Sequence, residues 1–186
     1  DLHNALIFVA GNLDVAFPGA AILDSESVGA DEFHLMTSGV TTSDIRNGLG
    51  KLFRPEHVSR LGSNFVVVPS LSSENYKKLI DRGISDFVEF LATRFNVKVQ
   101  VDSNVREFIY SEGAIPTQGT RILFPVIDNI LYDDLPTVVS EYQILKQRNP
   151  DDYRLTLKIS ENKKQGIWQI INSRGKMIKE FKTDFT

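Results

Sequence analysis

The sequence contains no cysteine, which excludes disulfide frameworks, thiolate metal sites and cysteine nucleophiles. It has no apolar run close to the roughly 20 residues that a membrane-spanning helix needs, and no signal peptide is visible. It also lacks a strong charge of either sign, because its formal net charge is -3 at pH 7. We therefore expect a cytoplasmic protein with no membrane partner and no general attraction to nucleic acid.

The 186 residues, of which 41% are hydrophobic, are enough for one domain or two small ones. Near the start, the continuous apolar run 5–10 ends in Gly11 and Asn12. Such a run is typical of a strand buried on both faces of a parallel sheet, where ligands bind beyond the carboxyl ends of the strands. The run Phe65–Val68 predicts a second buried strand, which Pro69 ends. Because the chain starts at Asp1 without a methionine, we expect a fragment with partner strands upstream.

Two weak motifs in the first third of the chain do not point to a metal or phosphate site. The stretch 13–40 is predicted to be a loop with one helical turn near 31–36. Asp24 and Glu26 faintly resemble a calcium loop, but the twelfth position holds Leu35 instead of an acid. The stretch 48–51 is not a phosphate-binding loop, because Ile45 and Leu52 replace its essential glycine and hydroxyl residue. The sequence predicts no metal site.

Helical periodicity and capping residues predict the elements that follow. A helix capped by Thr42 or Ser43 precedes a short helix that starts at Pro55 and ends near Gly62. We place a domain boundary near 69–72. Beyond it the pattern predicts a long helix after Ser72, a strand over 97–101, further helices near 103–113, 120–131 and 138–146, and an antiparallel three-stranded meander over 153–181.

Three motifs occur in a fixed order along the chain. They are an apolar strand ending in Asn12; the block Phe53–Glu56 with Arg60 four residues later; and Gly119-Thr120-Arg121 at the start of a helix. Together these motifs resemble the second half of an AAA+ ATPase module of the Clp unfoldase and disaggregase family. The resemblance covers most of the chain, although the family usually has alanine in place of Thr120.

The resemblance implies a role for each of four residues. Asn12 corresponds to sensor 1, which orients the attacking water, and Arg60 corresponds to the arginine finger that reaches the nucleotide of a neighbouring subunit. Arg121 corresponds to sensor 2 on the lid, and Gly119 allows the backbone to approach the nucleotide. Phosphoryl transfer needs positioning and charge stabilisation, which guanidinium groups supply.

The resemblance also implies a fold and a function. Residues 1–70 are expected to be an α/β remnant of an AAA+ large subdomain, with parallel-sheet strands, and 71–186 an α+β lid with a C-terminal meander. The intact protein is expected to be a hexameric chaperone that hydrolyses ATP with Mg²⁺ and acts on protein substrates. Because the Walker A and B motifs are absent, this chain alone is expected to bind neither ATP nor Mg²⁺ and to be inactive.

Two other readings stay open at the level of sequence. The chain could be a non-catalytic module derived from an AAA+ protein, used for oligomerisation or partner binding through its meander. It could also belong to an AAA+ protein that acts on nucleic acid, although the net charge disfavours this. A phosphate-binding loop and an Asp-Glu strand upstream in the gene would favour the ATPase.

Overall fold

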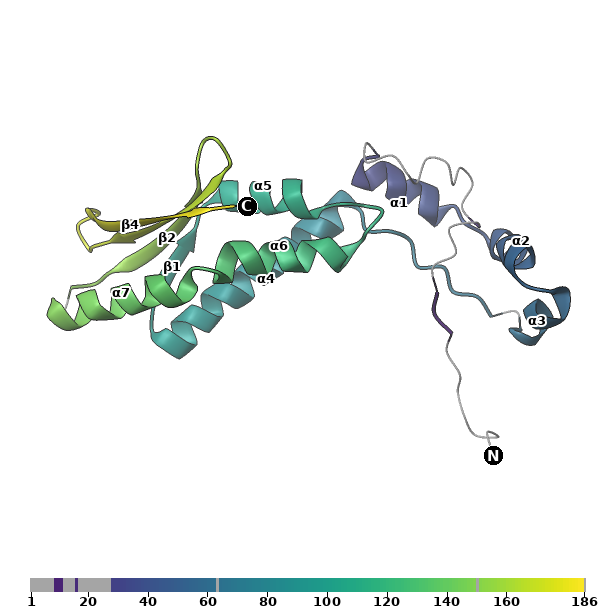
Figure 1. Cartoon of the computed structure of the whole chain (residues 1–186), viewed down its shortest axis with the longest axis horizontal. Helices are drawn as coiled ribbons and strands as arrows, with labels where there is room; N and C mark the ends of the chain where they lie inside the picture. The colour runs from purple at the N-terminus through teal and green to yellow at the C-terminus, as the bar shows by residue number, and fades with distance from the viewer. Residues whose placement is uncertain (1–8, 12–15, 17–27, 63, 150, 186) are drawn as a thin grey trace, which may run out of the picture. The chain divides into compact units, whose positions relative to one another are not determined.

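The computed structural model describes residues 9–11, 16, 28–62, 64–149 and 151–185, and Figure 1 shows its helices and strands. The chain divides into two compact units, 1–70 and 71–186.

The described part of the first unit is helical. It contains α1 (Ala30–Ser38), α2 (Thr42–Leu52) and α3 (Pro55–Arg60). The helix α1 replaces the single turn that the sequence predicted. The N-cap of α2 is Thr41, not Thr42 or Ser43, because Thr41 and Asp44 form a reciprocal capping box.

The second apolar run of the first unit differs from the prediction of a buried strand, because Val66 and Val68 are 88% and 83% exposed. Most of the first run, 5–10, lies outside the described residues; within it, Val9 is 79% exposed. No described residue of the first unit belongs to a strand. The apolar pattern is that of a sheet, but a strand forms only where a neighbouring strand supplies backbone partners, and the described part of this unit contains none.

A hydroxyl group holds the end of the first unit against α1. Thr37 Oγ1 donates to the Phe33 carbonyl oxygen at 3.0 Å and accepts from the Ser70 amide at 2.9 Å. Thr37 is buried, so these bonds satisfy a polar group that has lost its water. The extended segment that ends at Ser70 is thereby fixed to the C-terminal half of α1.

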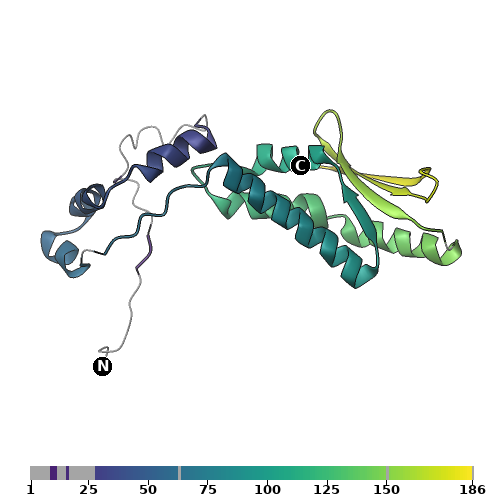
Figure 2. The same cartoon turned by 180° about the vertical axis from the view of Figure 1, so that it is seen from behind.

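The second unit contains four helices and a sheet in the part that the structure describes. Helix α4 is 23 residues long and is seen along its length in Figure 2. Its N-cap is Ser72, as predicted, and Asn96 ends it in the left-handed conformation. The helices are α4 (Ser73–Phe95), α5 (Ser103–Gly113), α6 (Thr120–Tyr132) and α7 (Leu135–Arg148).

The sheet has the strand order β1-β2-β3-β4. Strands β2 to β4 form the antiparallel meander that the sequence predicted, and β1 joins it in parallel beside β2. No local signal in the sequence indicates the β1–β2 pairing. The strands are β1 (Lys98–Val101), β2 (Arg154–Ile159), β3 (Gln165–Ile171) and β4 (Met177–Asp184). The result is a mixed sheet with helices, which is compatible with an α/β fold.

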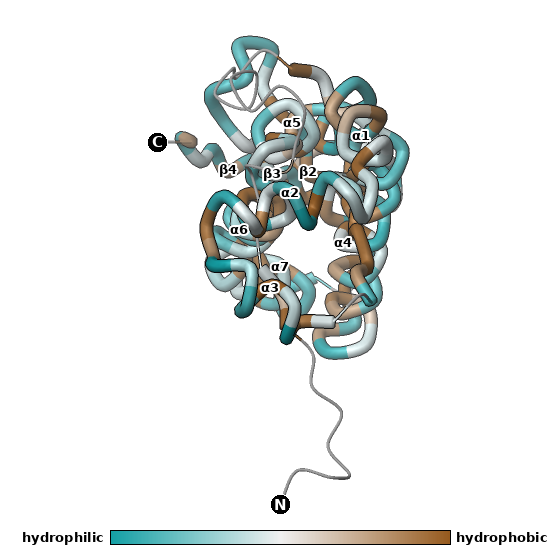
Figure 3. The backbone as a smooth tube through the Cα atoms, turned by 90° about the vertical axis from the view of Figure 1, so that its right-hand side faces the viewer, coloured by the Kyte–Doolittle hydropathy of each residue, from teal (hydrophilic) through white to brown (hydrophobic). Residues whose placement is uncertain are grey.

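The core of the second unit lies between the sheet and its helices. The strand register places Leu157 opposite Trp168, and Trp168 opposite Phe181. Trp168 is buried, and its ring lies 6.1 Å from that of Phe87 on α4. Figure 3 shows apolar and polar stretches alternating along the helices, as expected for elements with one buried face.

Candidate functional site

The start of α6 has an unusual backbone conformation. Its N-cap is Gly119, with φ 58° and ψ -135° and no side-chain cap. A residue with a Cβ is strained at this positive φ. Nothing lies within 4 Å of the place where a Cβ would stand. Glycine is therefore needed for the backbone conformation and not for lack of space. The space beside Gly119, at the start of the first turn of α6, is open to a ligand.

Arg121 lies in this open first turn. Its side chain is exposed, and the described residues offer it no ion pair and no hydrogen bond to its guanidinium group. The first turn of α6 contains no acidic residue. A helix N-terminus already carries partial positive charge, so an arginine there is unfavourable unless an anion is present. The charges at the start of α6 therefore fit a phosphate group.

A hydrogen-bonded turn supports the start of α6. The Gln118 amide donates to the Ile115 carbonyl oxygen at 3.0 Å, and the Arg121 amide donates to the Gln118 carbonyl oxygen at 3.3 Å. The Tyr76 hydroxyl of α4 donates to the same Ile115 carbonyl oxygen at 3.4 Å. Burial, and secondarily the nearby Tyr110, raises the pKa of Tyr76, so its hydroxyl remains a donor. Helical periodicity carries no signal for this support, because the bond joins Tyr76 to a main-chain group 39 residues away.

Arg60 lies in the last turn of α3. This helix starts at Pro55 and is followed by Gly62 at φ 78°, as the sequence predicted. The Arg60 side chain is exposed, and no ion pair with another described residue holds it. An exposed and unpaired guanidinium group on a short, well-delimited helix is available to a partner molecule.

The four predicted site residues belong to different parts of the chain. Gly119 and Arg121 lie in one turn of the second unit, and Arg60 belongs to the first unit. Asn12 lies outside the described residues.

The described residues contain no group of three or more His, Cys, Asp or Glu side chains that could hold a metal ion. Among them, no helix is both long and apolar enough to cross a membrane.

Comparison with known proteins gives a distant relationship. No family model matches the chain. Heat shock protein 104 of Schizosaccharomyces pombe is 23% identical over 145 residues, which cover 77% of this chain and 15% of that protein. The chain thus spans a small part of the length of the curated relative it matches. The similarity supports a distant relationship to the Clp family of AAA+ chaperones, to which the sequence motifs pointed.

Proposed function

We propose that this chain forms the C-terminal part of the AAA+ module of a Clp-like protein-remodelling ATPase. In this proposal 1–70 belong to the large subdomain and 71–186 form the lid. The observation that carries the proposal is the start of α6, where Gly119 and Arg121 form an exposed cationic turn without an acidic neighbour in the helix. The order of the sequence motifs and the similarity to a heat shock protein support it.

Each guanidinium group has its own role in the proposal. Arg121 contacts the terminal phosphate of ATP bound to its own subunit, and Arg60 contacts the ATP of the next subunit. Asn12 positions the attacking water. Bound ATP and Mg²⁺ supply the transferable phosphate and its metal, held by a phosphate-binding loop and acidic residues outside this sequence. The chain itself contributes positioning and charge stabilisation.

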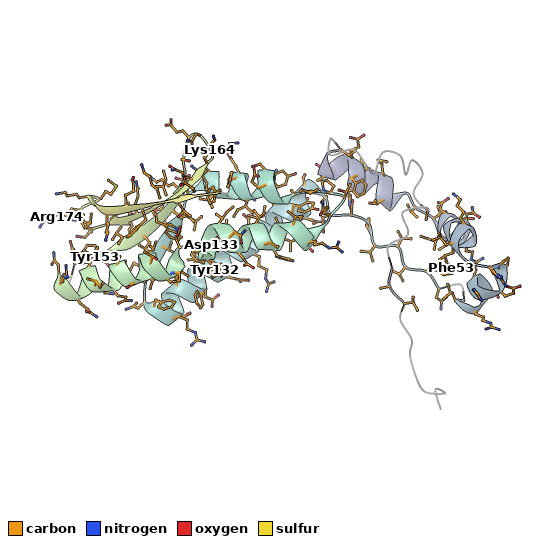
Figure 4. All side chains as sticks on the ribbon, in the orientation of Figure 1. Phe53, Tyr132, Asp133, Tyr153, Lys164 and Arg174 are labelled. Carbon is orange, nitrogen blue, oxygen red and sulfur yellow. The ribbon has the colours of Figure 1, made fainter. Side chains whose placement is uncertain are left out.

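The apolar surface of the first unit supports its assignment to a larger domain. Val66 and Val68 are exposed on the extended segment that ends at Ser70, and Phe53 is 48% exposed beside α3. Figure 4 labels Phe53 in this unit. Alternate residues of an extended segment, such as Val66 and Val68, share one side, and adjoining exposed apolar side chains mark a surface that another element covers. In the proposal, neighbouring strands of the AAA+ large subdomain cover Val66 and Val68.

The assembled machine in this proposal is a cytoplasmic hexamer that acts on protein substrates. A ring places the arginine finger of each subunit at the nucleotide of the next, so hydrolysis depends on assembly. The exposure of Arg60 at the end of α3 is compatible with a contact between subunits.

The test uses the longer protein that contains this chain, purified with its nucleotide-binding residues. We expect Arg60→Ala to lower ATP turnover roughly a thousandfold or more, while fluorescent-nucleotide binding is retained. Arg94→Ala is the matched control, because Arg94 is also an exposed arginine in the last turn of a helix. Normal turnover in Arg60→Ala would remove the finger role.

A second experiment separates the two arginines. Mixing Arg60→Ala subunits with subunits that cannot bind ATP should restore part of the activity, because a finger acts across subunits. Arg121→Ala should not be rescued by the same mixture, because sensor 2 acts within its own subunit. If neither the unaltered protein nor any mixture hydrolyses ATP, while the protein still assembles, the non-catalytic oligomerisation module is the better function.

A further inference from the structure

A hollow of about 180 Å³ opens between α5, α6 and the end of β4. Figures 1 and 2 both show the end of β4 beside α5. The floor of the hollow is apolar and includes Phe108, Val126, Ile130 and Phe185. The rings of Phe108 and Phe185 are stacked with centroids 5.0 Å apart. We call this hollow the α5–α6 groove.

The polar lining of the α5–α6 groove is acidic. It contains Glu112, Asp133 and Asp184, and no lysine or arginine. Asp184 Oδ1 accepts a hydrogen bond from Gln165 Nε2 at 2.7 Å. Within the described part of the chain, no cation pairs with the carboxylates of Glu112 or Asp133.

Helix dipoles make this charge less favourable. Glu112 lies in the last turn of α5, and Asp133 is the C-cap of α6. The C-terminal end of a helix carries partial negative charge, which lysine or arginine normally offsets. Neither helix has a basic residue in its last turn. Figure 4 labels Asp133 at the end of α6. At Asp133 the N-terminus of α7, which begins two residues later, offsets this effect, so the repulsion that a bound cation would relieve is the one at Glu112.

The groove is elongated along α6. Val126, Asn129, Ile130 and Asp133 are spaced three or four residues apart, so they share one face of the helix over about 10 Å. Glu112 precedes Gly113, where a Cβ would lie 3.5 Å from Val126 Cβ. The two acids therefore mark opposite ends of the groove, with the apolar floor between them. A single small cation would not span both ends.

We propose that the α5–α6 groove binds a short basic and apolar segment of a partner protein. Apolar side chains of that segment cover Val126 and Phe185, which are half-buried, while arginine side chains reach Glu112 at one end and Asp133 at the other. The long stem of arginine lies on aromatic surface while its guanidinium group meets a carboxylate. The charge of the lining excludes an acidic segment. This inference does not rest on the proposed ATPase.

The test is a binding titration of the full chain with a capped hexapeptide of sequence glycine–arginine–leucine–leucine–arginine–glycine. Binding is followed by two-dimensional NMR of the backbone amides. We expect saturable shifts at Asn129 and Asp133. Replacing both arginines of the peptide with citrulline, which is neutral and nearly the same shape, should weaken binding about tenfold. Replacing both leucines with serine should also weaken it.

A pair of matched variants locates the site. Glu112→Gln with Asp133→Asn should weaken binding of the arginine peptide about tenfold. Glu107→Gln with Asp128→Asn changes the net charge equally on the same two helices, at exposed acids outside the groove, and should change binding less than about twofold. All four positions are exposed, so unchanged Trp168 fluorescence should confirm folding in each case.

Four results would each overturn the proposal. The first is equal weakening by both variant pairs, which indicates general attraction to an acidic protein. The second is an affinity for the citrulline peptide equal to that for the original arginine peptide. The third is an affinity for the serine peptide equal to that for the original peptide. Non-saturable shifts spread over the whole surface would count in the same way as the first result.

Discussion

The side chain of Asn104 pairs with both main-chain groups of Ile159. Asn104 Oδ1 accepts from the Ile159 amide at 3.1 Å, and Asn104 Nδ2 donates to the Ile159 carbonyl oxygen at 2.9 Å. Just before this point, β1 ends at Val101, and the Asp102 amide bonds to the Leu157 carbonyl oxygen at 2.9 Å. The asparagine side chain thus continues the β1–β2 ladder after the backbone has turned into α5.

Asn104→Ala should destabilise the second unit by about 2 kcal/mol, because two partly buried main-chain groups lose their partners. Asn104→Asp keeps the acceptor but sets a carboxylate oxygen against the Ile159 carbonyl oxygen, so its cost should be at least as large as that of Asn104→Ala. Urea unfolding, monitored by Trp168 fluorescence, measures these changes in the free energy of unfolding. Trp168 is the only tryptophan of the sequence and is buried in this unit. Asn75→Ala, at an exposed asparagine in α4, is the control and should stay within about 0.5 kcal/mol of the unaltered chain.

Thr156→Val should raise the stability of the second unit by about 1 kcal/mol. Thr156 is buried, and its Oγ1 atom has no hydrogen-bond partner among the described residues. The isosteric valine removes the cost of burying that hydroxyl group. Thr93→Val, at an exposed helical threonine whose hydroxyl bonds to the Glu89 carbonyl oxygen at 2.8 Å, should bring no comparable gain. A loss of stability in Thr156→Val would mean that the hydroxyl is satisfied in solution.

Two glycines in helices should respond differently to alanine. At Gly113 a Cβ would lie 2.9 Å from Leu123 Cδ1 and 3.2 Å from the Leu123 backbone, so Gly113→Ala should destabilise by about 1–3 kcal/mol. At Gly83 the contacts are 3.2 and 3.4 Å to the side chain of Ile127, which can shift. Since alanine favours a helix by roughly 0.5–1 kcal/mol over glycine, Gly83→Ala should be close to neutral. Thermal unfolding compares the two, and an equal cost for both would contradict this packing.

The ion pair between Lys98 and Asp152 predicts a pH dependence of stability. Lys98 Nζ lies 2.8 Å from Asp152 Oδ2. Hydrogen bonding to Lys98 lowers the pKa of Asp152 below 3.8, so the pair stabilises above that pH and its contribution disappears as acid protonates Asp152. Hydrogen bonding to Asp152 raises the pKa of Lys98 above 10.5, so the contribution is present below that pH and disappears as Lys98 loses its proton.

Urea midpoints of Lys98→Met and the unaltered chain should therefore differ most near neutral pH and converge in strong acid and strong base. Both side chains are exposed, so the difference should be small and should shrink with added salt. Lys176→Met, at an exposed lysine with no ion pair among the described residues, is the control. A difference that persists unchanged in acid would show that packing, and not charge, explains the effect of Lys98.

The sequence predicted the elements that local signals determine. Ser72 caps α4, Pro55 begins α3, and the turn residues of the meander separate β2, β3 and β4, as expected from their own neighbours in the chain. The parallel pairing of β1 with β2 could not be predicted, because three helices separate Val99 from its partner Leu155 in the sequence. The bonds of Asn104 depend on that pairing and were missed for the same reason.

The predicted buried strand at Phe65–Val68 shows a different limit. Its run of apolar residues favours a strand buried inside a sheet. Val66 and Val68 are exposed, so the described part of the first unit does not bury them. For the candidate site, the local geometry of Gly119, Arg121 and Arg60 agrees with the sequence. Their convergence on a nucleotide depends on long-range placement and stays a prediction.

The pairing of β1 with β2 has a consequence for synthesis of the protein. As the nascent chain leaves the ribosome, Lys98–Val101 emerges before α5, α6 and α7, and its parallel partner Arg154–Ile159 follows only after all three. Domains complete their long-range contacts late when the partners are far apart in sequence. Translation that stopped after Arg148 would leave the valines of β1 and the apolar faces of the helices without the sheet that covers them.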